Sequence, residues 1–256
     1  MRGLALRVGQ WFFDVADVVG ELALFTVEVL RTALRGRWDG RETWRALYAV
    51  GVRSLPIIAV TAWFAGAIAV LQVGSYVVKF RAYEVMGWGF GYSVFREVGP
   101  LLVGLMFSGR VGAHNTAELG TMTVTEQVDA LRVLAIDPME YLVVPRLLAM
   151  ALMMAALNLV GDAFALVGGI LTAWALVGVD PYVFWNSFVE YVTVADLLNG
   201  LAKAGAFGVA VGLVSCGFGL AVRGGAPGVG RAVNASVVAS AVGIFVLDYF
   251  ITYLLR

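Results

Sequence analysis

Five long apolar segments restrict the fold of this chain more than any other feature of its sequence. They cover residues 55–78, 92–117, 145–177, 198–222 and 232–255. Each is at least as long as the roughly 20 residues that a helix needs to cross the hydrocarbon core of a bilayer. We therefore expect an all-α polytopic membrane protein with five transmembrane helices.

The composition agrees with this class and excludes others. The 256 residues are 61% hydrophobic and 14% charged, whereas soluble domains are about 45–50% apolar and about 25% charged. The formal net charge of zero argues against a nucleic-acid partner. The single cysteine, Cys216, excludes an internal disulfide. The first twenty residues lack a clean apolar signal region and contain Asp14 and Asp17, so we expect membrane insertion to use the helices themselves.

The N-terminal region predicts a helix that lies in the membrane interface rather than one that spans the bilayer. On a helix over residues 8–35, six charged side chains fall within an arc of about 100° and apolar side chains occupy the rest. They are Asp14, Asp17, Glu21, Glu28, Arg31 and Arg35. An alternative is that this stripe is only the solvated face of the helix. We expect an elbow helix and a basic connector over residues 8–53, followed by a transmembrane bundle over residues 55–255. Together they form one domain of residues 1–256.

The arginines predict the orientation of the chain in its membrane. Eight arginines lie within the first 53 residues, and further ones follow the second and fourth apolar segments. Those in the two later connections are Arg132, Arg146, Arg223 and Arg231. Because basic residues concentrate in cytoplasmic connections, the N-terminus is expected in the cytoplasm. Five crossings then place the C-terminus on the outer side.

The connection after the second segment predicts a short cytoplasmic helix. Thr123 and Glu126 have the spacing of a capping box, in which both side chains bind free backbone N–H groups at a helix start. Polar and apolar residues then alternate over about three turns, and Asp137-Pro138 predicts a second helix start. The residues of interest are Thr123, Glu126, Gln127, Asp129, Leu131 and Arg132. Such a hairpin suits docking onto a partner, and the alternative is an ordinary helix within a loop.

Three ionisable residues are expected at a similar depth in the outer half of the bundle. Glu97, with Arg96 beside it, lies near the outer start of the second segment, and Lys203 lies near that of the fourth. Asp248 precedes the outer end of the fifth. A charged side chain in lipid costs roughly 2.5–3.5 kcal/mol, so such residues pair or face water, and their presence indicates function. We expect Glu97, Lys203 and Asp248 to pair around an outward-facing cavity. Snorkelling to the interface and a purely structural ion-pair network are the alternatives.

A second polar set lies at the inner end of the second segment. Arg110, His114 and Glu118 recur every four residues and predict a polar seam along one helix face. A metal site is not expected, because one histidine and one carboxylate do not complete a ligand set. The sequence contains no Walker motif and no set of catalytic residues. We expect no cofactor on this chain, and any ATP would be hydrolysed by a partner subunit.

Four short motifs lie in the central part of the chain: REVGP at 96–100, SGRVG at 108–112, AELGTM at 117–122 and TEQ at 125–127. These motifs resemble those of the MlaE/YrbE family of ABC permeases. The resemblance extends from about residue 40 to the end and is densest between 96 and 146. It implies a permease that moves phospholipids or related lipids and does not itself catalyse a reaction. It also implies an elbow helix followed by five spans, in the inner membrane.

The same resemblance implies partners and residue roles. The family works as a homodimer with cytoplasmic ABC ATPase subunits, a periplasmic MCE-domain lipid-binding protein and often a STAS-domain subunit. The segment 123–134 resembles the coupling helix that contacts the ATPase. Glu97, Lys203 and Asp248, with Arg96 adjoining, match polar positions of the family's lipid cavity.

Two functions from other classes stay open from the sequence. One is a membrane-embedded enzyme that uses Glu97 or His114 as an acid or base, although the chain has no nucleophile or metal set to accompany them. The other is an ion-coupled secondary transporter with protonation at Glu97 and Asp248. His114 departs from the small or apolar residues usual in the family, so its role is left open. An associated ATPase would distinguish the ABC permease from both.

Overall fold

The computed structural model describes residue 16, residues 20–35 and residues 40–254, and all the regular structure in these parts is helical. A helix over 20–34 comes first. The elements that follow are α2 (Gly40–Gly51), the 3-10 turn η1 (Val52–Ser54), α3 (Leu55–Phe80), the 3-10 turn η2 (Tyr83–Val85), α4 (Met86–Ser93), the π-helical segment η3 (Val94–Val98), α5 (Gly99–Phe107), the π-helical segment η4 (Ser108–Gly112), α6 (Ala113–Val124), α7 (Gln127–Val133), the π-helical segment η5 (Met139–Val143), α8 (Val144–Thr172), the π-helical segment η6 (Ala173–Val177), α9 (Pro181–Tyr191), α10 (Val194–Leu220) and α11 (Gly225–Leu254).

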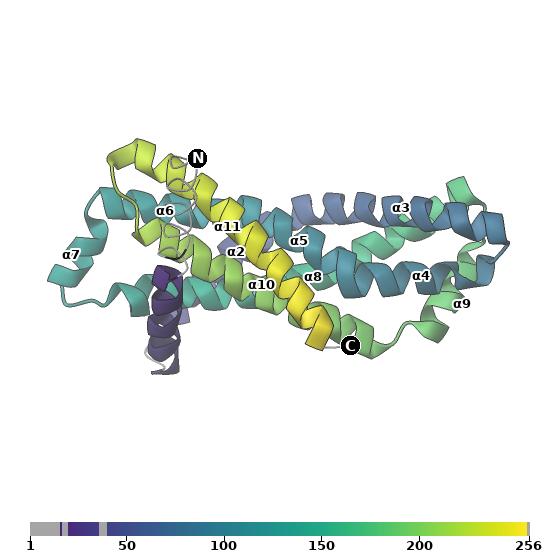
Figure 1. Ribbon diagram of the computed structural model, residues 1–256, viewed down its shortest axis with the longest axis horizontal. Coiled ribbons are helices and arrows are strands. Elements are labelled where there is room, and N and C mark those ends of the chain that lie inside the picture. The colour runs from purple at the N-terminus through teal and green to yellow at the C-terminus, as the bar shows by residue number, and fades with distance from the viewer. Residues whose placement is uncertain (1–15, 17–19, 36–39, 255–256) are drawn as a thin grey trace, which may run out of the picture.

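The helices form one long bundle with α7 at one end and α9 at the other (Figure 1). Among the described residues, four helices are long and apolar enough to cross a membrane. They are Gly40–Phe80, Met139–Val177, Val194–Leu220 and Gly225–Leu254. The predicted first segment is therefore longer than expected, because α2 runs through η1 into α3 without a break. The predicted basic connector is helical from Gly40 onward, and residues 36–39 of it lie outside the described residues.

The predicted second span is helical but differs from the other four. It runs from Met86 to Val124 as α4, η3, α5, η4 and α6, with two π-helical segments within it. It carries charged residues at Arg96, Glu97 and Arg110, and it is not among the four apolar helices. The expected number of five spans therefore depends on this one helix.

The N-terminal helix lies across the α7 end of the bundle, in a direction transverse to the long helices (Figure 1). Within residues 20–34, Val29 and Thr32 are buried, whereas Leu24 and Leu34 are exposed. The charged residues of the predicted stripe that fall in the described part are all exposed, and Asp14 and Asp17 lie outside the described residues. One face of this helix therefore packs on the bundle, and the other face carries both apolar and charged side chains.

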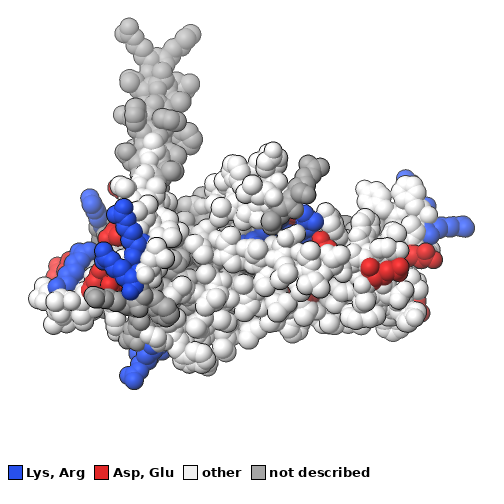
Figure 2. Space-filling model, turned by 90° about the horizontal axis from the view of Figure 1, so that it is seen from below, with Lys and Arg blue, Asp and Glu red and all other residues white. Residues whose placement is uncertain are grey.

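Charged side chains gather mainly at the two ends of the molecule (Figure 2). The surface between the ends is largely uncharged in this view, apart from one small group of basic and acidic atoms. An uncharged belt between two charged ends is the surface that a bilayer requires, because charged side chains are costly at membrane depth.

Close packing between α3 and α8 depends on glycines from both helices. A Cβ atom added at Gly66 of α3 would overlap the backbone carbonyl of Ala165 in α8, and one added at Gly168 of α8 would overlap that of Trp63 in α3. Small residues let membrane helices approach until their backbones touch, which increases van der Waals contact. These two glycines therefore set the separation of α3 and α8.

We expect Gly66→Ala to destabilise the protein by about 1–3 kcal/mol, because the added methyl group forces α3 and α8 apart. Gly205→Ala in α10 is the matched control, because a Cβ there meets no atom within 4 Å. The free energy of unfolding of the control should stay the same or rise by up to about 1 kcal/mol, because alanine has a better helix propensity than glycine. Thermal unfolding of the purified variants in detergent measures the difference. Equal midpoints for the two variants would contradict this packing.

Helix α9 lies between the third and fourth predicted segments, where the sequence analysis predicted no helix. The Asp180 carboxylate accepts a hydrogen bond from the backbone N–H of Tyr182 at 2.7 Å, and Pro181 occupies the first helical position. The next helix, α10, begins with a capping box formed by Thr193 and Asp196. Asp-Pro and Thr-x-x-Asp are sequence signals for helix starts, so both could have been recognised beforehand.

Candidate functional site

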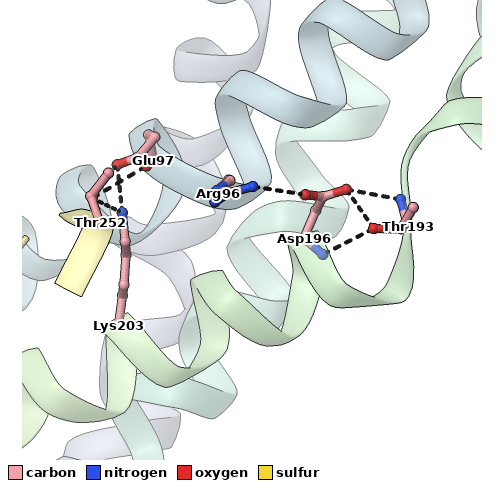
Figure 3. A network of polar contacts seen from close by, with 6 residues as sticks. All are labelled: Arg96, Glu97, Thr193, Asp196, Lys203 and Thr252. Atoms are coloured by element: carbon pink, nitrogen blue, oxygen red, sulfur yellow. Dashed lines mark hydrogen bonds and ion pairs between the residues drawn. The ribbon is translucent and has the colours of Figure 1, made fainter. Parts of the chain in front are cut away.

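The structure brings the three ionisable residues of the outer half into direct contact. The Lys203 ammonium from α10 lies 2.5 Å from a carboxylate oxygen of Glu97 in η3 and 3.0 Å from one of Asp248 in α11. It also donates a hydrogen bond of 2.7 Å to the Thr252 hydroxyl. Figure 3 shows Glu97 and Thr252 converging on Lys203 from different helices. We refer to Glu97, Lys203, Asp248 and Thr252 as the Lys203 cluster.

Burial explains why this lysine needs so many partners. The Lys203 side chain is 1% exposed, so its ammonium receives almost no hydration from bulk water. An ammonium group has three N–H donors, and two carboxylates and one hydroxyl lie within reach of them. A buried charge is tolerated only when paired and hydrogen-bonded in this way. Glu97 is 31% exposed, so the cluster has an exposed side as well as a buried one.

Thr252 is a member of the cluster that the sequence analysis missed. It follows Asp248 by four residues, so both lie on one face of α11. Its hydroxyl lies 3.4 Å from both carboxylate oxygens of Glu97 as well as near Lys203. A threonine four residues after a membrane-embedded carboxylate was the available signal.

Arg96 has different partners from Glu97, although the two residues are adjacent. Its guanidinium lies 3.5 Å from a carboxylate oxygen of Asp196 and over the ring of Tyr92, at 5.3 Å from the ring centre. Figure 3 shows the guanidinium directed toward Asp196 and away from Lys203. Arg96 adjoins Glu97, as expected, and its contact with Asp196 joins η3 to the capping box of Thr193 and Asp196.

The predicted capping box at Thr123 is wrong. Helix α6 continues through Thr123, whose hydroxyl donates to the carbonyl oxygen of Leu119 at 2.9 Å. Glu126 makes no side-chain cap and has a left-handed backbone conformation with φ of 60°. Threonine within a helix often binds the carbonyl four residues before it, and this competing bond replaces the expected cap. The hairpin therefore turns at Glu126 rather than at Thr123.

Helix α7 begins at Gln127 and has seven residues, so it is shorter than the three turns expected. It lies at the extreme end of the bundle (Figure 1). Val128 is buried, and Leu131 packs partly against the same apolar cluster. Asp129 and Arg132 form an exposed ion pair of 2.8 Å. Helix α7 is therefore fixed to the bundle by its apolar side and presents a polar side outward.

The second predicted helix start is confirmed. The Asp137 carboxylate accepts a hydrogen bond of 2.9 Å from the backbone N–H of Met139. The carbonyl oxygen of Asp137 accepts from the N–H of Tyr141 at 3.0 Å. These bonds start η5, which continues into α8. The chain therefore returns into the bundle directly after α7.

Arg110, His114 and Glu118 line a common cavity of about 500 Å³ between α2, α6 and α8. The Glu118 carboxylate accepts two hydrogen bonds from the Arg146 guanidinium, of 2.9 and 3.1 Å. His114 is 76% exposed and lies 4.0 Å from Glu118. The three residues share one side of the helix, as predicted. The arginine that pairs with Glu118, Arg146, comes from α8 and was not assigned to this seam from the sequence.

The family model described as Permease MlaE matches residues 43–254. The chain belongs to the MlaE permease family. This match confirms the family that the motifs between residues 96 and 146 indicated. This permease is 38% identical to a probable ABC transporter permease protein of Rickettsia felis, over 99% of this chain and 98% of that one. It is 36% identical to a probable ABC transporter permease protein of Synechocystis sp., over 99% and 95% of the two chains.

A relative from a plant belongs to the same comparison. The chloroplast protein TRIGALACTOSYLDIACYLGLYCEROL 1 of Arabidopsis thaliana is 31% identical over 88% of the permease and 64% of its own length. Membership of an ABC permease family makes this chain a membrane-embedded transport component. Such a permease works with an ATPase, which in these transporters supplies the energy.

Proposed function

We propose that this permease moves phospholipids or related lipids between its own membrane and an MCE-type periplasmic carrier, driven by a separate ATPase subunit. The Lys203 cluster carries the proposal. A buried ammonium with two carboxylates, one of them 31% exposed, is a polar feature at membrane depth that scaffold packing alone does not require. It suits a lipid headgroup that must pass an otherwise apolar bundle. The name of the chloroplast relative, which is that of a galactolipid, also supports a lipid substrate.

The proposed topology has five crossings in the inner membrane, with Met86–Val124 as the second. That helix is long enough for a crossing and runs through the bundle between its two ends (Figure 1). The arginines near the α7 end support a cytoplasmic N-terminus, and five crossings then put the C-terminus in the periplasm. The transverse helix over 20–34 would be the interfacial elbow helix.

The proposed assembly is a homodimer with an ABC ATPase, an MCE-domain protein and, in some complexes, a STAS-domain subunit. Helix α11 supports the dimer, because only 11% of its most apolar 18-residue stretch is buried within the chain. Its exposed apolar side chains are Val238, Val242, Phe245, Val246, Tyr249, Phe250, Tyr253 and Leu254. They face either lipid or a second copy.

The proposed mechanism links the two ends of the Met86–Val124 helix. The ATPase would bind around α7, and closure of two ATPase subunits would move α7 together with α6. Because α6 continues through η4 and α5 into η3, the movement would reach Glu97 in the Lys203 cluster. The π-helical segments η3 and η4 interrupt the regular helix along this path. Such segments often lie at functional positions.

Reconstitution of the permease with its ATPase and a lipid acceptor tests the function. We expect phospholipid transfer that requires both ATP and the ATPase subunit. Transfer by the permease alone, driven by a proton gradient, would support the ion-coupled transporter instead. Conversion of the lipid to a hydrolysis product by the permease alone would support the membrane-embedded enzyme. An ATPase that co-purifies with the permease but supports no lipid transfer would contradict the proposed substrate.

A further inference from the structure

The cavity at the α7 side of the bundle has the volume of a ligand site. Its volume of about 500 Å³ falls within the roughly 300–1,000 Å³ of small-molecule pockets. Its apolar lining includes Ala46, Ala49 and Val50 of α2 and Met150 of α8. Charged side chains come from the same two helices, with Glu42 and Arg45 on α2 and Arg146 on α8, so apolar and ionic side chains line the cavity together.

The charged side chains that line the cavity carry an excess of positive charge. Four arginines and two glutamates line the cavity, and each glutamate is already paired. Glu42 lies 2.7 Å from Arg45, and Glu118 binds Arg146 with two hydrogen bonds. Within each of these two pairs the negative and the positive charge cancel.

Two arginines remain to attract an anion. Arg53 and Arg110 line the same cavity, are exposed, and form no ion pair with any residue that the structure describes. Arginine presents a planar fork of N–H donors that matches the oxygen atoms of a phosphate group. The uncompensated charge of the cavity therefore favours a phosphate group over a neutral or cationic ligand.

Aromatic side chains on α2 place the cavity beside the headgroup region of a membrane. Trp44 and Tyr48 lie on α2, which lines the cavity, and they are 73% and 59% exposed. Exposed tryptophan and tyrosine residues collect at membrane–water interfaces. A lipid of the adjacent leaflet could therefore reach the cavity with its phosphate at the arginines and its chains along α2.

We propose that this cavity binds the phosphate-bearing headgroup of a membrane lipid from the leaflet at the α7 end. The site is separate from the Lys203 cluster, since the residues of that cluster do not line it. Its use as the entry or exit point of transported lipid rests on the proposed function, whereas lipid binding does not. Arg53 and Arg110 hold the phosphate, and Arg146 is held in place by Glu118 and Asn115.

Photo-crosslinking in nanodiscs of stated composition tests the site. The probe is phosphatidylglycerol with a diazirine close to its headgroup, and mass spectrometry of peptides maps the crosslinks. We expect crosslinks on peptides covering residues 46–50 and 142–150. The R53Q/R110Q variant should reduce them roughly tenfold, because it removes both charge-assisted phosphate contacts. Both arginines are exposed, so this variant should fold.

The R223Q/R231Q variant is the matched control, because it removes two exposed arginines that lie outside the cavity. It should change the crosslinks by less than about twofold. Equal losses in both variants would overturn the site in favour of general attraction to an anionic surface. Unchanged crosslinks in R53Q/R110Q would also overturn it.

Competition then separates the sources of the phosphate group. Unlabelled phosphatidylglycerol should displace the probe, and diacylglycerol, which has no phosphate, should not. Displacement by inorganic phosphate as effective as that by the lipid would reject a lipid site in favour of a free-anion site. Crosslinking in the absence of ATPase measures binding alone. A positive result there together with absent ATP-driven transfer would refute the proposed function and leave this site standing.

Discussion

Lys203→Met should be among the most damaging single substitutions in this permease. It removes the cation of the Lys203 cluster and leaves the carboxylates of Glu97 and Asp248 without this ion-pair partner in a largely buried position. Breaking a buried ion pair on one side costs about 3–5 kcal/mol. The lower end of this range applies, because Glu97 is 31% exposed and water can partly solvate its carboxylate. Loss of about 3 kcal/mol should lower the thermal midpoint by roughly 10 °C, and lipid transfer should fall with it.

A triple variant separates stability from transport. In E97Q/K203M/D248N no charge is left in the cluster, so much of the lost stability should return. If transfer stays low while stability recovers, the charges act in transport. Recovery of both would support a purely structural ion-pair network, which the sequence left open. Lys79→Met is the control for loss of an exposed lysine, and its midpoint should shift by less than about 2 °C.

The Lys203 cluster could be foreseen because it depends on few assumptions. The direction of each span follows from the arginines, and a rise of about 1.5 Å per residue then gives the depth of each charge. Glu97, Lys203 and Asp248 therefore emerged at one level without knowledge of how the helices pack. Thr252 did not, because a hydroxyl has no marked cost in an apolar segment. The partner of Arg96 also depends on side-chain direction, which depth does not specify.

Local signals were less reliable where a helix could continue. Thr123 and Glu126 have capping-box spacing, yet helix α6 extends past Thr123. The hydroxyl then finds a carbonyl within its own helix, so a cap is not needed. At Asp137 the following proline prevents the helix from extending backward, and the predicted start is present. The same physical rule also marks α9 at Asp180.

Leu131→Pro should uncouple ATP hydrolysis from lipid transfer. Helix α7 has only seven residues, and a proline at its centre removes an internal hydrogen bond and costs about 3 kcal/mol. Position 128 would be a poor choice, because Val128 lies in the first turn, where proline is tolerated. Helix α7 contributes one buried residue, Val128, to an apolar cluster that other elements otherwise form, so the protein should still insert. We expect ATPase activity to persist and ATP-dependent transfer to fall roughly tenfold.

Leu131→Ala is the matched control, because it removes the same apolar contact and keeps the backbone N–H. It should lose much less transfer than the proline variant, since alanine favours a helix. If both variants lose transfer equally, the packing of Leu131 matters and the helical shape of α7 does not. ATP-dependent transfer at the unsubstituted rate in Leu131→Pro would remove α7 from the coupling path. In that event the Met86–Val124 helix would have to receive the motion elsewhere. The turn between α10 and α11, which exposes Arg223 and Gly224, is another connection at this end (Figure 1).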